Sequence, residues 1–391
     1  MPGTFTKFVP SSIGVGAFDA IAETAKGLGI SKAMLVYDPF LPDAFEKAKS
    51  LLEKDGIGVV SYSVPLGEPT DESVEECARQ LHAAGGVDGI IGLGGGAALD
   101  TAKGCNCLAN NPPPLADYSV NFGTKVAGNG LPMILMPSTS GTGSECSWVS
   151  VITFPSRGSK ASIRSMECCL ASYAIIDPEI TMGMPPALTA NTGIDALCHA
   201  CESMTISPEK NLNPISDALA KEAIRIVVKY LPIAYKDGKN AEARAKMGAA
   251  ATMAGMAFTN AMNHLPHAFG HSLGATLHLP HGYACGQALP IILNYIADVQ
   301  PVRLAEVAEC LVVTLPENAT PEQIGKAVGE FIIDFYAKLD FQTLKEKGYS
   351  LDECMKAADL VQKDACYPFT PKTMDMDTIK KYIEKIYNRE L

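Results

Sequence analysis

Residues 92–100 read GLGGGAALD; they begin at the end of the apolar run Asp88–Leu93 and lead into a helical pattern over Ala97–Ala109. Glycines at such a turn let backbone N–H groups approach a phosphate, and the N-terminus of the following helix adds positive potential. The spacing matches the dinucleotide fingerprint G-x-G-x-x-A, although it follows the third predicted strand and not the first. A glycine-rich turn without a ligand stays an alternative on this stretch alone.

Apolar runs of strand length alternate with helical patterns through residues 1–184. The predicted strands are Ala33–Tyr37, Val59–Ser63, Asp88–Leu93 and Pro132–Met136, and the helices are Ala17–Leu28, Pro42–Lys54, Asp71–Ala84 and Ala97–Ala109. Such alternation predicts an α/β domain with a parallel sheet and helices on both faces. From about Pro185 helical patterns alone follow, so residues 185–391 are predicted to form an all-α domain.

A second polar turn, PSTSGTGS at residues 137–144, follows the next predicted strand. Open parallel sheets bind ligands at the carboxyl ends of their strands, so both turns are expected at one edge of the sheet. Asp38 ends the strand AMLVYD and is placed to accept hydrogen bonds from ribose hydroxyls. Its charge would repel a 2′-phosphate and so favours NAD over NADP. The alternative for Asp38 is an ordinary turn residue before Pro39.

Five of the seven histidines lie within residues 263–282, NHLPHAFGHSLGATLHLPHG. A sixth, His199, comes four residues after Asp195 in an apolar helical pattern. Residues four apart lie on one helix face, about 6 Å along the axis, so this pair can reach one ion. The same spacing joins His267 and His271. Imidazole and carboxylate groups in a non-polar context predict a site for a divalent metal, although spacing alone does not choose among the histidines.

Two further residues adjoin this pattern. His281 follows Pro280, a helix breaker, and is predicted to lie on a loop. Glu202 shares the helix face of Asp195 and His199, where it could accept a hydrogen bond from a ligand N–H. An ion-paired helix residue is the alternative for Glu202.

Composition limits the class of protein. A net charge of -11 argues against a nucleic-acid-binding surface, which needs a basic face. No apolar run approaches the roughly 18 residues of a membrane helix, and no secretory signal is recognisable. The twelve cysteines lack zinc-ribbon spacing, and reduced thiols in a cytoplasmic enzyme are their simplest explanation.

Four segments together resemble the iron-dependent (group III) alcohol dehydrogenase family: GLGGGAALDTAK (92–103), PSTSGTGSE (137–145), DPEITMGMPPALTANTGIDALCHACES (177–203) and HAFGHSLGATLHLPHG (267–282). The resemblance extends over nearly the whole chain, in the family's order. It implies a Rossmann-like NAD-binding N-terminal domain followed by a helical, metal-binding C-terminal domain. It implies a metal-dependent oxidoreductase that interconverts a small alcohol or diol and its aldehyde or ketone with NAD. The expected ion is Fe²⁺, with Zn²⁺ possible because the donor set suits both. A homodimer or larger homo-oligomer is also expected.

The resemblance implies a role for each matching residue. Asp195, His199, His267 and His281 correspond to the metal ligands, and His271 to a histidine assigned to proton relay or nicotinamide contact. The positions implied for cofactor binding are Gly95, Gly96, Ala97, Asp100, Thr139, Thr142 and Lys160, alongside Asp38. Those implied for the substrate pocket are Trp148, Val149, Phe258 and Cys366. Departures from the family's pattern include Ala97, where Ser is usual, Glu68, and the segment 367–372.

The substrate is predicted to be small and uncharged. Between Lys246 and Arg303 the chain has no lysine or arginine, so the histidine-bearing segment offers no cation to bind a carboxylate or phosphate. A zinc-dependent glycerol-type polyol dehydrogenase is the nearest alternative. A lyase of the dehydroquinate synthase type is less consistent with the sequence, because its anionic substrate needs a basic cluster.

Overall fold

The computed structural model describes residues 4–121 and 123–391. The chain divides into two compact units. The α/β unit contains residues 7–139 and 143–183. The helical unit contains residues 184–391 together with residues 4–6 and 140–142.

A six-stranded sheet forms the centre of the α/β unit. Its order is β1-β8-β5-β4-β2-β3, and every neighbouring pair is parallel. The strands are β1 (Ser11–Ile13), β2 (Lys32–Tyr37), β3 (Gly58–Ser63), β4 (Gly89–Gly94), β5 (Met133–Pro137) and β8 (Tyr173–Ile176). The predicted α/β fold with a parallel sheet is therefore confirmed, with two short strands, β1 and β8, that the apolar runs did not indicate.

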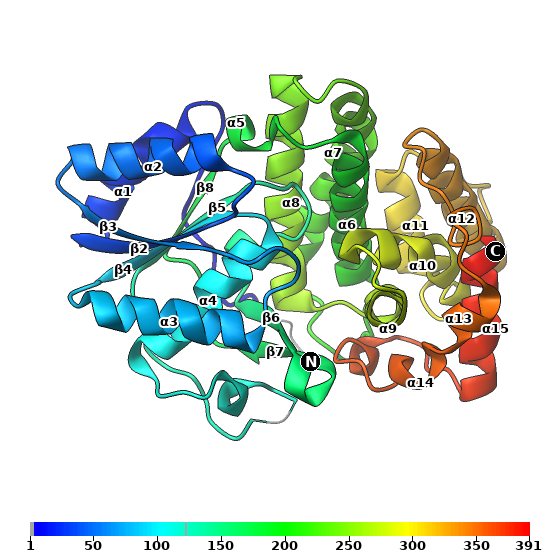
Figure 1. Cartoon of the computed structure of the whole chain (residues 1–391). Helices are drawn as coiled ribbons and strands as arrows, with labels where there is room; N and C mark the ends of the chain where they lie inside the picture. The colour runs from blue at the N-terminus through cyan, green and yellow to red at the C-terminus, as the bar shows by residue number, and fades with distance from the viewer. Residues whose placement is uncertain (1–3, 122) are drawn as a thin grey trace. The chain divides into compact units, whose positions relative to one another are not determined.

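Helices cover both faces of this sheet because successive side chains of a strand point to opposite faces. Ala33 and Leu35 of β2 share a buried core with residues of α1 and α2. On the other face, β4 lies so close to α4 that a Cβ on Gly92 would lie 3.0 Å from that of Ala102. Figure 1 shows α2 and α3 on opposite sides of the sheet. The helices are α1 (Ile21–Gly27), α2 (Pro42–Lys54), α3 (Asp71–Ala84), α4 (Gly96–Asn110) and the short α5 (Pro178–Thr181).

An antiparallel hairpin interrupts the parallel pattern. Strands β6 (Val149–Phe154) and β7 (Ser159–Arg164) pair with each other in a two-stranded sheet outside the main one. The segment PSRGSK at 155–160, which has the composition of a helix breaker, forms the turn, where Gly158 takes a positive φ of 58°. Pro155 and Gly158 therefore mark a reversal of the chain within the α/β unit.

The helical unit confirms the prediction of an all-helical second half, because strands end at β8 among the described residues. Its helices are α6 (Pro186–Thr205), α7 (Pro214–Lys236), α8 (Ala241–Ala261), α9 (Leu265–Leu277), α10 (His281–Tyr295), α11 (Pro301–Cys310), α12 (Pro321–Ala337), α13 (Leu351–Met355), α14 (Ala358–Val361) and α15 (Met376–Asn388). A single apolar core links them. No helix in the described part of the chain is long and apolar enough to cross a membrane.

Helices α9 and α10 approach each other closely where both carry histidines. A Cβ on Gly270 would lie 2.5 Å from Cys285 Sγ and 2.7 Å from its Cα, so glycine is required for this contact. His281 is the first residue of α10, after Pro280 at its N-cap. The prediction that His281 lies on a loop was therefore wrong: proline is well accommodated at a helix start, and here it marks one.

Changing Gly270 to Ala should destabilise the protein by about 1–3 kcal/mol, because the methyl group would overlap Cys285 and force α9 away from α10. Gly274 on the same helix is the matched control: its added Cβ would meet neighbours at an ordinary 3.7 Å. Gly274→Ala should be neutral or up to about 1 kcal/mol more stable, given the helix propensity of alanine. Urea unfolding followed by circular dichroism measures both; equal stability of the two variants would contradict the packing argument.

Candidate metal centre

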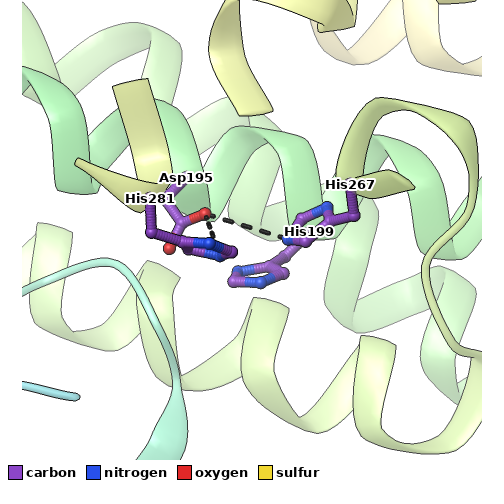
Figure 2. Close-up of side chains that lie close together, drawn as sticks. All are labelled: Asp195, His199, His267 and His281. Atoms are coloured by element: carbon purple, nitrogen blue, oxygen red, sulfur yellow. Dashed lines mark ion pairs between the residues drawn. The ribbon is translucent and has the colours of Figure 1, made fainter. Parts of the chain in front are cut away.

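Three helices bring the four predicted metal ligands together. Asp195 and His199 lie one turn apart on α6, His267 lies on α9, and His281 opens α10. One ligand atom from each lies within 4.8 Å of all the others. Figure 2 shows the four side chains gathered together. Asp195, His199 and His267 are buried, whereas the His281 side chain is 37% exposed. Solvent therefore reaches the cluster on the side of His281, whereas the other three side chains are enclosed by protein.

Several atoms in this cluster lack the partners that burial normally requires. Within the described chain, Asp195 Oδ1, His199 Nδ1 and His267 Nε2 are buried without a hydrogen bond. Asp195 Oδ1 lies 3.5 Å from His281 Nε2 and 3.9 Å from His267 Nε2, too far for hydrogen bonds. Each such atom costs about 1–3 kcal/mol unless something binds it. Three imidazoles and one carboxylate are a donor set that fits a first-row divalent cation.

The electrostatics of the cluster suit a cation. Burial, and then the charge of Glu202, raise the pKa of Asp195 to about 8. Burial also holds the pKa values of His199 and His267 well below the ordinary range, although a hydrogen bond with the Gly141 backbone opposes this for His199. Both imidazoles are therefore neutral, the form that binds metals.

Glu202 orients the imidazole ring of His267 through a hydrogen bond. Its buried Oε1 lies 2.5 Å from His267 Nδ1, and Oε2 accepts the backbone N–H groups of His264 and His267 at 2.8 and 3.3 Å. Burial raises the pKa of Glu202 well above its usual range, and the backbone N–H groups of His264 and His267 oppose that shift. Three N–H donors directed at its oxygens favour the carboxylate form. His267 then donates from Nδ1 and presents Nε2 to the cluster. These contacts favour the hydrogen-bonding role for Glu202 over the alternative of an ordinary ion-paired helix residue.

His271 lies beside the four ligands and bonds to a residue distant in sequence. Its Nδ1 is 2.8 Å from Asp364 Oδ2, and its ring stacks on that of His281 at 5.2 Å. Burial alone would raise the pKa of Asp364, but the charge and hydrogen bond of His271 lower it overall. Nothing in the sequence signals this pair, because 93 positions separate its members.

The four predicted pocket residues divide between the two units. In the helical unit, the ring of Phe258 stacks on that of His199 at 4.3 Å. Cys366 is buried there, and its backbone N–H donates to Asp364 Oδ1. Trp148 and Val149 belong to the α/β unit, at the start of β6. Phe258 and Cys366 thus give the surroundings of the histidines an apolar character.

The glycine turn lies where β4 ends and α4 begins. Gly94 has a φ of 154°, and a Cβ there would lie 2.8 Å from that of Asp38, so β2 and β4 end side by side. Gly95 is the N-cap of α4, and Gly96 and Ala97 form its first turn. Thr139 Cγ2 would lie 3.5 Å from a Cβ on Gly95, which brings the second polar turn beside the first.

Asp38 and Lys160 have local partners in the α/β unit. The Asp38 Oδ1 atom accepts the backbone N–H of Phe40 at 2.9 Å and caps the turn after β2. The ammonium group of Lys160 pairs with Glu68, which also accepts the Thr153 hydroxyl at 3.2 Å. Thr142, with the rest of residues 140–142, belongs to the helical unit, where a Cβ on neighbouring Gly141 would overlap the backbone of Thr192.

Asp100 is largely engaged inside the protein. It accepts the Ser144 hydroxyl at 2.8 Å and the Val151 N–H at 3.0 Å. Lys103, which is fully buried on the next turn of α4, donates to Ser144 Oγ, Ser147 Oγ and the Val149 carbonyl at 2.7–3.0 Å. Burial lowers the pKa of Lys103 and raises that of Asp100, and their mutual attraction opposes both shifts. This pair, which we call the loop anchor, ties the second polar turn to α4.

Lys103 is the residue that the sequence analysis missed. Its signal was present: a lone lysine three positions after Asp100 in the otherwise uncharged helix GAALDTAKGCNCLAN. A buried charge in such a helix requires partners, and the second polar turn supplies them.

Comparison with known proteins gives consistent matches over both units. The family described as "Iron-containing alcohol dehydrogenase" matches residues 10–178, and "Fe-containing alcohol dehydrogenase family, C-terminal" matches residues 189–387. Sulfoacetaldehyde reductase of Bilophila wadsworthia is 40% identical over 303 residues, 76% of each chain. Sulfoacetaldehyde reductase of Bifidobacterium kashiwanohense, solved in complex with NAD⁺, superposes with a TM-score of 0.88 at 28% identity, covering 100% of both chains. A 1,3-propanediol oxidoreductase superposes with a TM-score of 0.90 at 29% identity, over 98% of this chain and 100% of that one.

Changing Glu202 to Gln should weaken divalent-metal affinity by about 10–100-fold, because the amide cannot accept all three N–H donors and no longer fixes His267. Chelator-competition titration with Zn²⁺ measures this directly. Glu330→Gln on the exposed face of α12 serves as control and should leave the affinity unchanged. An unaltered affinity in the Glu202 variant would remove its orienting role.

Proposed function

We infer that the chain, which belongs to the iron-containing alcohol dehydrogenase family, is a metal- and NAD-dependent oxidoreductase that interconverts an alcohol and its aldehyde or ketone. The family resemblance seen in the sequence is confirmed by these matches and by the curated relatives. The observation that carries the mechanism is the convergence of one carboxylate and three imidazoles within 4.8 Å. Family membership decides against the lyase alternative.

Asp195, His199, His267 and His281 are the residues that we propose to hold the ion. When bound, Fe²⁺, or Zn²⁺ in its place, supplies Lewis-acid activation of the substrate oxygen. The protein contributes neutral imidazoles and a carboxylate whose buried atoms otherwise lack partners. Because the His281 side chain is 37% exposed, an ion held there would be accessible to substrate.

The α/β unit is the proposed NAD-binding domain. NAD supplies the hydride acceptor, and the relative from Bifidobacterium kashiwanohense was solved with it bound. The N-terminus of α4, formed by Gly95, Gly96 and Ala97, offers backbone N–H groups to a pyrophosphate. Roles in cofactor contact for Thr139, Thr142 and Lys160 stay predictions. For Asp100, the contacts with Ser144 and Val151 favour an indirect role, in which it holds the second polar turn in place.

His271 is the proposed proton-transfer residue. Its Nδ1 is bonded to Asp364, which leaves Nε2 as the nitrogen that exchanges a proton with the substrate hydroxyl. The side chain is 30% exposed, so the proton can pass on to water. Asp364 balances the positive charge that His271 carries while protonated.

A small uncharged alcohol, diol or aldehyde is the proposed substrate. Phe258 and Cys366 surround the histidines with apolar groups, and residues 247–302 contain no lysine or arginine. Identity of 40% to a sulfoacetaldehyde reductase favours a second candidate, a small sulfonated aldehyde. That substrate would require a cation supplied from outside residues 247–302.

The cysteines support a proposal about the cellular compartment. All twelve are buried and none forms a disulfide, which supports a reducing compartment, and we propose the cytoplasm. The homodimer or larger oligomer stays a prediction.

Metal-stripped protein given NAD and a small diol should form NADH when Fe²⁺ is added anaerobically. His267→Ala and His281→Ala should lose both metal retention and turnover, because each removes a donor from the cluster. NADH consumption with an uncharged aldehyde and a sulfonated aldehyde, at matched concentrations, distinguishes the two substrate classes. If neither Fe²⁺ nor Zn²⁺ restores NADH formation or consumption with either substrate class, the proposed reaction is refuted.

Changing Asp38 to Ser should raise kcat/KM for NADP relative to NAD by at least about tenfold, equivalent to roughly 1.4 kcal/mol of removed repulsion. Serine can still accept the Phe40 N–H, so the turn should persist. Asp55→Ser, beyond the C-terminal end of α2, changes the net charge equally and should not alter cofactor preference. An unchanged ratio in the Asp38 variant would leave this residue a simple turn former.

A further inference from the structure

A second group of potential metal ligands lies beside the four already described and shares none of them. His271 on α9, and Asp364 and Cys366 on the segment after α14, place a nitrogen, an oxygen and a sulfur atom within 4.8 Å of one another. All three belong to the helical unit. The ring of His271 lies 5.2 Å from that of His281 and 5.6 Å from that of His267, so the two groups adjoin without merging.

This second group is both ordered and reachable. Asp364 joins its members: Oδ2 lies 2.8 Å from His271 Nδ1, and Oδ1 accepts the Cys366 N–H at 2.8 Å. The side chains of His271 and Asp364 are 30% and 14% exposed, whereas Cys366 is buried. An ion arriving from solvent would therefore meet the imidazole and carboxylate first and the sulfur at the inner end.

The donor types indicate which ions would bind. Zinc binds nitrogen and oxygen at about 2.0–2.2 Å and thiolate sulfur at about 2.3 Å, so its ligands need only small side-chain rotations from the observed separations. A thiolate selects Zn²⁺ and Cd²⁺ over Mg²⁺, which prefers oxygen. The first cluster has no sulfur among its four proposed ligands, so the two groups differ in the ions they favour.

We propose that His271, Asp364 and Cys366 form a second, inhibitory site for Zn²⁺ or a similar thiophilic divalent ion. An ion bound there occupies His271 and prevents it from exchanging a proton with the substrate. Inhibition by excess zinc then occurs while iron stays in the first cluster. This inference rests on the function proposed for His271, but binding of the ion does not.

Cadmium provides a test of binding that is independent of turnover. Iron-loaded enzyme titrated anaerobically with Cd²⁺ should develop an ultraviolet thiolate-to-cadmium band that saturates at one ion per chain, with iron content unchanged by elemental analysis. Cys366→Ala should abolish the band. Cys310→Ala, a buried thiol on α11, is the matched control and should retain it. A band that persists in the Cys366 variant would overturn the site.

Inhibition by Zn²⁺ is measured relative to the zinc-free activity of each variant. Asp364→Asn and Cys366→Ala should each raise the inhibitory Zn²⁺ concentration by at least about tenfold. Even the loss of a residue that only supports a metal ligand weakens metal affinity by about that much. Loss of one iron per zinc gained would instead mean displacement from the first cluster and would refute the proposal. Should the enzyme lack alcohol dehydrogenase activity, the cadmium band would still decide whether the site exists.

Discussion

One buried carboxylate determines the geometry of the helical unit around the candidate centre. Glu202 on α6 accepts hydrogen bonds from His267 Nδ1 and from two backbone N–H groups at the start of α9. It therefore sets both where α9 begins and which nitrogen of His267 faces the cluster. The tight contact at Gly270 then holds α10, and with it His281, against α9. The convergence of donors from three helices depends on these two contacts.

The same burial that shapes the cluster makes it unfavourable without a cation. Asp195 and Glu202 are both enclosed, and the pKa of Asp195 is raised to about 8 by burial and by its neighbour. Removing charged groups from water costs several kcal/mol per ion unless an opposite charge compensates. A divalent cation held at the proposed site would supply that charge and would bind the donor atoms that otherwise lack partners. Stability and metal affinity are therefore linked in this fold.

The sequence predicted those parts of the fold and site that depend on local pattern. Apolar runs and glycine turns located β2 to β5, and four-residue spacing put Asp195 with His199 on one helix. Prediction from sequence failed where a local pattern fits two structures, or where a residue's interaction partner is distant in the chain. Pro280 indicated a loop, whereas it is the N-cap of α10. The pairing of Asp364 with His271 depends on tertiary structure, and no local rule could have found it.

The loop anchor of Asp100 and Lys103 has a consequence for cofactor affinity. Because Lys103 and Asp100 hold Ser144, Ser147 and the backbone of β6, the second polar turn is ordered before any ligand arrives. The conformational entropy lost in fixing that turn is then part of the folding equilibrium. Association with a dinucleotide would consequently have little loop ordering to oppose it, as expected of a preorganised receptor.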